Sequence, residues 1–529
     1  MLQKIAKIAL ILAGYFLVIS FVSNTFDGDF GWHLRFGRDA FAGNFQYLDT
    51  YTWPHFGLSW TNHEWGGDLL FWLLYSSFGY FSLVLLISAA IWGAFLLAQK
   101  IFFKKISISG IILSLAGIAC LKFLLGLRLA FLVLMLFTLL WLTLEKLPKI
   151  KSYFLWPPLL WLWSALHGSW ALGFIIINIY TFGNIIYLMI KNKFPRLAGK
   201  DTGWTGKTIL ASFFWQAISA LFLLFNPYGT KIWTEVGEYF TSGYFKTIIT
   251  EWIPSYAYPV YVWPLIIAAF TAVFAVWGWL TKKVTLAQLL FFFAIFYSAW
   301  QYKRNNVYLV LICIPALTII FGLAKEKIIS AFNLKTTVQE RIALVSAALA
   351  IMLIALFAPS VRINSDIWKD RELLLRYPFP YDAVEFLTKE TVGRQIYLFN
   401  EFHWGGYLNW TMPDTLIYFD GRGTATWKYS NDETRLERYR KIKYQAGGFN
   451  ELEQGPAEYV ILSQYYASYK KPNMINKIIF GEKGIAEALV PDPPQLEKML
   501  RKSGSWQIIF EDKIAIVWKR VNKTSPTTK

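Results

Sequence analysis

A cluster of ionisable residues follows the first apolar segment of the chain. Asp27, Asp29, His33 and Arg35 come directly after an apolar run near residues 5–23. Charged side chains beside a membrane-spanning segment are energetically costly and often mark a functional site. Asp29 and His33 are four residues apart, so a helix over this stretch would place them on one face. A carboxylate in this position could act as a general base toward an acceptor hydroxyl or amide.

The same loop contains further groups that could take part in chemistry. Asp49 follows, and then the sequence Asn-His63-Glu64-Trp. Two carboxylates and an imidazole, with His33, His63, Glu64 and Asp49 as the candidates, could hold a divalent metal such as Mg²⁺ or Mn²⁺. A third interpretation is structural, with Asp27 or Asp29 capping a following helix and His33 satisfying the carboxylate. The residue types alone do not decide whether these side chains act as a general base, bind a metal or cap a helix.

Basic residues also occur where the charge pattern predicts the outer side of a membrane. They are Arg128, Lys303 and Arg304. The guanidinium fork of arginine matches phosphate oxygens, so these residues are candidates for binding the phosphate of a lipid carrier. The alternative is that they extend toward lipid headgroups without a specific ligand.

The elements that position these residues are predicted to be membrane-spanning helices. The 529 residues are 55% hydrophobic and 16% charged, whereas soluble domains carry about 25% charged residues. Apolar runs close to the roughly 20 residues that cross a bilayer recur along the chain. We predict about eleven spans, near residues 5–23, 80–102, 107–125, 128–144, 153–167, 170–190, 207–225, 261–280, 284–301, 306–324 and 342–358.

The net charge of +18 is concentrated in alternate short loops between apolar runs. This is the positive-inside pattern, and it argues for a multi-pass protein of the plasma (inner) membrane. The N-terminus is then cytoplasmic and an odd number of spans places the C-terminus outside. Because the basic residues are accounted for by topology, nucleic acid is not an expected partner.

Residues 1–358 are therefore expected to form a transmembrane domain with two long outer loops, 24–79 and 226–260. Residues 359–529 are expected to form an extracytoplasmic α/β domain, because strand and helix patterns alternate there. The predicted helices are 381–389, 434–444 and 495–502. The predicted strands are 395–399, 415–419 and 458–462, followed by a hairpin over 506–518.

Two turns of this outer domain follow predicted strands. One contains His403, Gly405 and Gly406, and the other contains Arg422. Glycine allows a backbone to approach a ligand closely, and ligands of α/β sheets lie at such strand ends. We predict that the two turns converge, either around a ligand or as tight packing turns.

Several functions are not supported by the sequence. It contains no P-loop, GxSxG, HExxH or Rossmann GxGxxG pattern, so ATP-driven transport and serine hydrolysis find no support. A non-enzymatic lipid or polysaccharide transporter, or an envelope assembly scaffold, is the main alternative to an enzyme. Transporters place ionisable residues mid-span beside broken helices, whereas here the ionisable cluster lies at one face, which favours an enzyme.

The chain resembles the GT-C superfamily of membrane glycosyltransferases over most of its length. The Asp27-Gly-Asp29…His33…Arg35 block after the first span is similar to the acidic block of the oligosaccharyltransferase catalytic subunit. Little-characterised bacterial members of the superfamily carry similar blocks, here Trp-His33-Leu, Asn-His63-Glu64-Trp, Asn226-Pro-Tyr-Gly and Trp404-Gly405-Gly406-Tyr-Leu. Two features depart from the oligosaccharyltransferase pattern: the Trp404 turn lacks its aspartate, and Leu124-Leu-Gly-Leu replaces an acidic pair.

This resemblance implies a membrane enzyme that uses a polyprenyl-phosphate or pyrophosphate sugar donor. It implies that Asp29 is the leading catalytic carboxylate and Asp27 the second. The expected reaction transfers the sugar, with inversion, to a glycan, lipid or protein acceptor at the outer face of the membrane. In that reaction Arg304, Arg128 and Lys303 are expected to hold the carrier phosphate.

Overall fold

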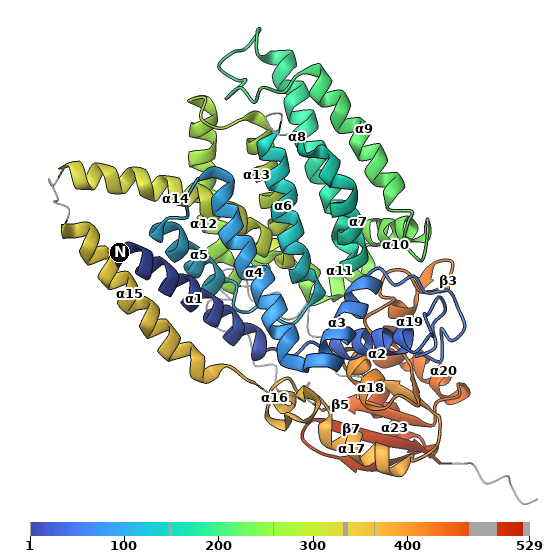
Figure 1. Ribbon diagram of the computed structural model, residues 1–529. Coiled ribbons are helices and arrows are strands. Elements are labelled where there is room, and N and C mark those ends of the chain that lie inside the picture. The colour runs from blue at the N-terminus through green and yellow to red at the C-terminus, as the bar shows by residue number, and fades with distance from the viewer. Residues whose placement is uncertain are drawn as a thin grey trace, which may run out of the picture. The chain divides into compact units, whose positions relative to one another are not determined.

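The computed structural model describes residues 2–147, 151–257, 259–331, 337–363, 366–464 and 495–521. The chain divides into two compact units, each built from three separate stretches. The helical unit contains Met1–Thr25, Phe81–Thr230 and Thr250–Ile363. The α/β unit contains Phe26–Tyr80, Lys231–Ile249 and Asn364–Lys529. Figure 1 labels the elements of both units.

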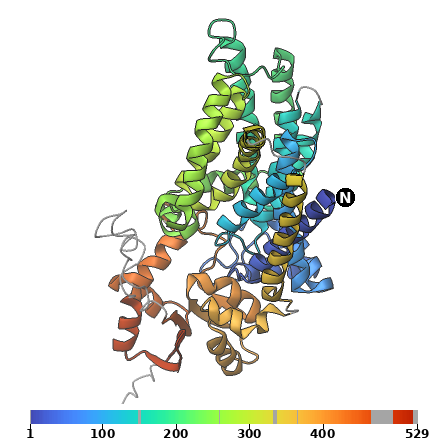
Figure 2. The same cartoon turned by 90° about the vertical axis from the view of Figure 1, so that its left-hand side faces the viewer.

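The helical unit consists of long apolar helices that run alongside one another in Figure 1 and Figure 2. A helix coincides with each predicted span. In chain order the helices are α1 (Leu2–Ser23), α4 (Tyr80–Phe102), α5 (Ile108–Cys120), α6 (Leu132–Lys146), α7 (Trp156–Leu166), α8 (Ala171–Ile190), α9 (Gly206–Phe222), α12 (Pro259–Leu280), α13 (Leu286–Gln301), α14 (Asn306–Ala331) and α15 (Thr337–Phe357).

Six helical segments in the described part of the chain are long and apolar enough to cross a membrane. They are Leu2–Ser23, Tyr80–Phe102, Leu129–Lys146, Gly168–Ile190, Val260–Leu280 and Lys303–Ala324, and shorter apolar helices lie at Ile108–Cys120, Leu286–Gln301 and Leu344–Ser360. Within the unit, α1 packs along α15, α8 along α13, and α5 along α14. The predicted total of eleven crossings stays a prediction.

The α/β unit is organised around a five-stranded sheet with the order β2-β1-β5-β7-β6. The strands are β1 (Ile396–Asn400), β2 (Thr415–Ile417), β5 (Tyr459–Ser463), β6 (Trp506–Glu511) and β7 (Ala515–Arg520). β1 pairs in parallel with β2 and β5, whereas β7 pairs antiparallel with β5 and β6. These strands confirm the predicted strands and hairpin. The helices α17 (Tyr381–Glu390), α19 (Arg435–Tyr444) and α23 (Gln495–Lys502) likewise confirm the predicted helices.

The first long loop packs into the α/β unit. It contributes α2 (Phe30–Phe41) and α3 (Trp65–Phe78). A short extended piece also runs beside β2: the Ile417 amide donates to the Tyr51 carbonyl at 3.1 Å, and the Trp53 amide donates to the Ile417 carbonyl at 3.0 Å. The side chains of Phe30, Phe36 and Tyr51 are almost fully buried. This loop therefore supplies part of the unit's core.

Glycines allow the loop to lie against the C-terminal part of the chain. α2 packs on α18 (Gly405–Thr411), and a Cβ atom added at Gly31 would lie 2.0 Å from the Gly406 carbonyl oxygen. Any larger residue at Gly31 would push the two helices apart.

The second long loop divides between the units. Its first part forms α10 (Lys231–Thr241) and α11 (Tyr244–Ile248), which group with the α/β unit. The sequence predicts two continuous domains that meet at residue 358. The structure instead groups residues by contact, so 26–80 and 231–249 join the C-terminal residues.

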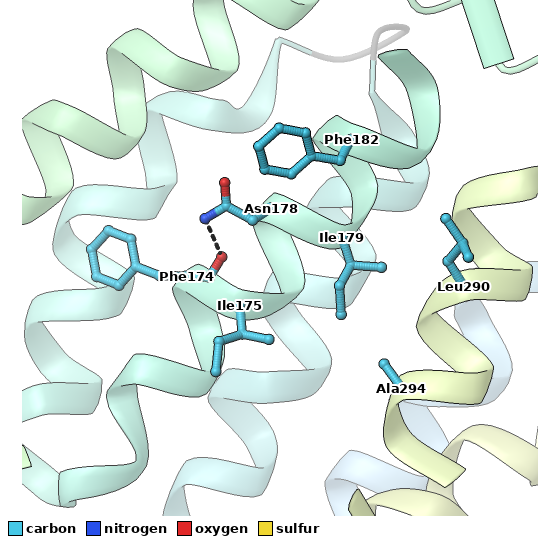
Figure 3. A pocket seen from close by; sticks show the side chains of 7 residues that line it. All are labelled: Phe174, Ile175, Asn178, Ile179, Phe182, Leu290 and Ala294. Atoms are coloured by element: carbon cyan, nitrogen blue, oxygen red, sulfur yellow. Dashed lines mark hydrogen bonds between the residues drawn. The ribbon is translucent and has the colours of Figure 1, made fainter. Parts of the chain in front are cut away.

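A shallow apolar groove lies on the helical unit between α8 and α13 (Figure 3). It has a volume of about 520 Å³ and is lined by Phe174, Ile175, Asn178, Ile179, Phe182, Leu290 and Ala294. The polar side chain among them, Asn178, donates to the Phe174 carbonyl oxygen at 2.9 Å. Since no titratable group lines it, we assign no chemistry to this groove.

Candidate functional site

Asp29 occupies the N-cap position of α2, yet its side chain makes no capping hydrogen bond. The neighbouring Asp27 carboxylate instead accepts a hydrogen bond from the Asp29 amide at 3.1 Å. The Asp29 carboxylate lies against the turn after β2: a Cβ atom added at Gly421 would lie 2.3 Å from its Oδ1. Of the two residues proposed as helix caps, Asp29 makes no capping bond and Asp27 accepts an amide at the start of α2, while the Asp29 carboxylate faces the turn that contains Gly421.

The surroundings of Asp29 favour its protonated form. Burial raises the pKa of Asp29 to about 7, with further upward contributions from the charges of Asp27 and Asp420. The neighbouring His33 opposes this shift. A carboxylate with a pKa near the working pH combines a substantial deprotonated fraction with strong basicity, which suits a general base.

The four-residue spacing on α2 would allow His33 to pair with Asp29, but His33 pairs with a residue of another helix. Its Nδ1 lies 2.6 Å from Oδ1 of Asp68, a residue of α3, and its Nε2 lies 3.7 Å from Oε2 of Glu64. Asn62 donates to the other oxygen of Asp68 at 2.7 Å. The partner of His33 comes from α3, the next helix of the loop, while His33 stays close enough to Asp29 to influence its pKa.

The electrostatics of this pair are consistent with an imidazolium and a carboxylate. Burial lowers the pKa of His33, but the Asp68, Glu64 and Asp29 carboxylates raise it more strongly, to about 9. Burial raises the pKa of Asp68 to about 6, against the opposing effect of His33. At neutral pH the pair is ionised, and it ties α2 to α3.

The donor set does not fit a divalent metal. Among the described residues, no group of three or more His, Cys, Asp and Glu side chains is arranged to hold a metal ion. Asp49 lies in a different cluster, with Arg422.

His63 connects the first loop to α10. Its Nδ1 lies 3.8 Å from Oε1 of Glu235, and its ring packs edge-on against Tyr239 with 5.5 Å between the ring centroids. Burial lowers the pKa of His63, but the Glu235 and Glu64 carboxylates give a net increase. Thr426 donates to Glu235 at 3.1 Å, and the Tyr239 hydroxyl donates to the Arg422 carbonyl at 3.3 Å. α10 thus contributes to the surroundings of the acidic site.

Arg422 lies at the centre of a closed cluster. Its Nη1 is 2.9 Å from Oδ1 of Asp49, and its Nε and Nη2 donate to the Asp420 carboxylate at 2.8–3.0 Å. The side chains of Arg422, Asp49 and Asp420 are fully buried. The guanidinium also stacks within 4.5–5.1 Å of the rings of Tyr51, Trp60 and Trp427. Arg422 and Asp49 pair with each other, which favours the packing alternative for the turn that contains Arg422.

The two glycine turns converge, as predicted. A Cβ atom added at Gly405 would lie 2.5 Å from the Asp420 Cβ, and one at Gly406 would lie 2.1 Å from the Gly28 carbonyl oxygen. The side chain of His403 is exposed, while its carbonyl oxygen lies beside Gly28. The Asp27–Asp29 segment is therefore held directly against both turns.

The predicted phosphate-binding residues meet in the helical unit. Arg128 and Arg304 both face Glu251: Arg128 forms an ion pair with its Oε1, and Nη1 of Arg304 lies 3.8 Å from its Oε2. All three side chains are partly exposed, Arg128 by 40%, Arg304 by 27% and Glu251 by 26%. Lys303 precedes Arg304 in the same 3₁₀ turn, Lys303–Asn305.

Four residues of these sites escaped the sequence-based prediction: Asp68, Glu235, Tyr239 and Glu251. A signal was present for three of them. Asp68 is a lone carboxylate in an apolar helix, four residues after Glu64, and Glu235 and Tyr239 share a helix face. Glu251 gave no signal, because nothing in its local sequence indicates two arginine partners far along the chain.

Comparison with known proteins identifies the fold. No protein-family model matches the chain, and no curated protein sequence matches it. Solved structures do match. ArnT from Cupriavidus metallidurans, bound to undecaprenyl phosphate, aligns with a TM-score of 0.53 at 12% identity, over 98% of this chain and 97% of ArnT. The oligosaccharyltransferase AglB from Archaeoglobus fulgidus aligns with a TM-score of 0.51 at 13% identity, over 88% of this chain and 70% of AglB.

The chain has the fold of the GT-C glycosyltransferases. A second AglB structure, tethered to an acceptor peptide with the sequence NVT, aligns with a TM-score of 0.50 at 13% identity, over 87% of this chain and 70% of AglB. The first AglB structure is a complex with an inhibitory peptide and a dolichol-phosphate. At these identities the GT-C likeness concerns the fold, so the chemistry of this chain rests on its own residues.

Proposed function

We propose that this protein is a membrane glycosyltransferase. It moves a sugar from a polyprenyl-phosphate (or pyrophosphate) carrier to an acceptor at the outer face of the plasma (inner) membrane, where the acceptor is a glycan, lipid or protein. The observation that carries the proposal is the Asp29 carboxylate, which makes no capping hydrogen bond and has a pKa of about 7. The GT-C fold supports the class of reaction.

Asp29 acts as the general base in this proposal. Its carboxylate accepts the proton of the acceptor hydroxyl or amide as the acceptor atom attacks the anomeric carbon. The bond from that carbon to the carrier phosphate breaks, and its electron pair leaves with the phosphate. Attack from the face opposite the phosphate inverts the configuration. Asp27, which accepts the Asp29 amide, positions the base.

Arg128, Arg304 and Lys303 hold the carrier phosphate. Negative charge grows on the phosphate as the glycosidic bond breaks, so cations already in position lower the barrier. His33 and His63 shape the surroundings of Asp29 through their pairs with Asp68 and Glu235, and Glu64 contributes by facing His33. The N-terminus is cytoplasmic and the α/β unit is extracytoplasmic.

The test is transfer by the purified protein. It is incubated with a panel of polyprenyl-phosphate sugars, and release of the carrier is followed by mass spectrometry. The D29N variant should lose transfer by a factor of roughly 10² or more, while D432N, an exposed carboxylate of the same unit, should retain it. Normal transfer by a folded D29N protein would remove Asp29 as the base. Lipid movement across vesicles without a covalent product would favour a transporter.

A further inference from the structure

The basic cluster of the helical unit contains one carboxylate, Glu251, which faces both Arg128 and Arg304. Oε1 of Glu251 forms an ion pair with Arg128, whereas Oε2 lies 3.8 Å from Nη1 of Arg304. The second separation exceeds hydrogen-bonding distance. One carboxylate thus lies between two guanidiniums. A phosphate group presents more oxygens in a tetrahedral arrangement and can satisfy two forks together.

The cations are held by contacts other than Glu251. The Arg304 guanidinium stacks over the Trp252 ring at 4.9 Å, and the Lys303 ammonium lies 5.8 Å from the Tyr261 ring centroid. Such cation–π contacts favour a fixed position of the charge over the ring face. The arrangement of the basic groups therefore does not depend on the Glu251 carboxylate alone.

The backbone next to Glu251 is hydrogen-bonded to the segment that contains Arg304. Glu251 lies in a 3₁₀ turn, Thr250–Trp252. The Lys303 amide donates to the Ile253 carbonyl at 3.0 Å, and Asn306 donates to the Ser255 hydroxyl at 2.6 Å. The turn stays in place through these bonds, so the Glu251 side chain can leave the arginines by rotation without moving the backbone.

We propose that Glu251 is a placeholder for the carrier phosphate. It occupies the arginine pair while no lipid phosphate is bound, and the phosphate displaces it on binding. This inference rests on the proposed role of Arg128 and Arg304 in holding the donor. Glu251 thereby lowers the affinity of the arginine pair for any anion that must displace it.

The competition has a measurable consequence for affinity. A ligand that must displace an internal partner binds more weakly, in proportion to the fraction of molecules in which the partner is absent. Partly exposed ion pairs contribute up to about 1 kcal/mol each, and Glu251 faces two guanidiniums. Removal of the Glu251 charge should therefore raise the affinity for a phosphate ligand by roughly two- to tenfold.

The experiment measures binding of undecaprenyl phosphate to the full-length protein in nanodiscs. E251Q should bind it two- to tenfold more tightly than the unchanged protein, roughly the range given by such pairs. Undecaprenol, which lacks the phosphate, should bind equally to both. Inorganic phosphate should gain affinity for E251Q as well, which separates recognition of the phosphate group from recognition of the lipid. E238Q is the matched control, because Glu238 makes a partly exposed ion pair elsewhere, with Lys428.

Two further variants separate the possible failures. If R128Q and R304Q bind undecaprenyl phosphate normally, the phosphate-binding part of the proposed function is wrong. If both bind it weakly but folded E251Q shows no gain, the placeholder role alone is overturned and Glu251 is a structural tie. E251D keeps the charge on a shorter side chain and should fall between E251Q and the unchanged protein. An E251D affinity equal to or below that of the unchanged protein would count against displacement.

Discussion

Arginines occur in two contrasting surroundings in this protein. Arg422 of the α/β unit is fully buried, paired with two carboxylates and packed against three aromatic rings. Arg128 and Arg304 of the helical unit are partly exposed and share one carboxylate. The Arg422 guanidinium is enclosed by protein groups and closed to solvent, whereas the Arg128 and Arg304 guanidiniums are accessible to solvent. Burial therefore distinguishes Arg422 from the two arginines that we propose bind the carrier phosphate.

The largest expected effect comes from the closed cluster. R422K keeps the charge but loses the planar fork that reaches Asp49 and Asp420, so it leaves buried carboxylates poorly paired. We expect a loss of about 3–5 kcal/mol in the free energy of unfolding. The measurement is the thermal midpoint followed by tryptophan fluorescence in detergent. R394K is the control, since its ion pair with Glu458 is exposed. Equal midpoints for the two variants would show that the cluster is not structural.

The next effect tests whether the turn that contains Gly421 and Arg422 positions Asp29, the proposed catalytic base. G421A places a methyl group 2.3 Å from Oδ1 of Asp29 in the present geometry, so the carboxylate or the turn must move. A displacement of about 1 Å costs on the order of 10² in rate. G447A is the control, because a Cβ atom there meets no neighbour within 4 Å. The measurement is the transfer rate at saturating donor. A G421A enzyme as fast as G447A would remove the link between the turn and Asp29.

The pH dependence of transfer gives a smaller effect. Asp29 must be deprotonated to act as a base, and burial raises its pKa to about 7. The rate should therefore rise about tenfold per pH unit below 7 and level off above it. The measurement is the rate between pH 5 and 8. A profile that levels off near pH 4, where an exposed aspartate titrates, would contradict the proposed surroundings of Asp29.

The smallest effect on stability comes from the open cluster. R304K is the same substitution as R422K, but it acts on an arginine that is 27% exposed and 3.8 Å from its carboxylate. We expect a change of less than about 1 kcal/mol in the free energy of unfolding, with a rise in the KM for the lipid donor because lysine lacks the fork. Thermal midpoints and donor titrations measure the two quantities. A large fall in the midpoint of R304K would erase the contrast between the two clusters.

The local parts of this structure could be predicted from the sequence. Apolar runs indicated the helices, and alternating patterns with glycine turns indicated the sheet of the α/β unit, because periodicity acts over short stretches. The acidic block after the first helix also stood out. Partners were harder to predict: the sequence did not indicate that His33 pairs with Asp68, and it left the Arg422 turn open between ligand binding and packing, whereas in the structure Arg422 pairs with Asp49.

These failures have one physical cause. A motif shows which groups are present, but their partners are set by contacts between distant parts of the chain. The pairing of Tyr51 with Ile417 and the contact of Gly31 with Gly406 bring the first loop onto the C-terminal residues. Neither contact leaves a periodic signal in a single sequence. Sequence patterns therefore could not predict that residues 26–80 belong to the α/β unit.

The discontinuous assembly of the α/β unit has a consequence for biosynthesis. Asp49 emerges from the ribosome long before its partner Arg422, and Phe30 emerges long before Trp368, whose ring stacks on it. Until then an unpaired carboxylate and apolar rings stay uncovered, a state prone to aggregation and recognised by chaperones and proteases. A chain that stops at residue 363 would lack the partners of its own first loop, so premature termination should lead to degradation and not to a stable helical fragment.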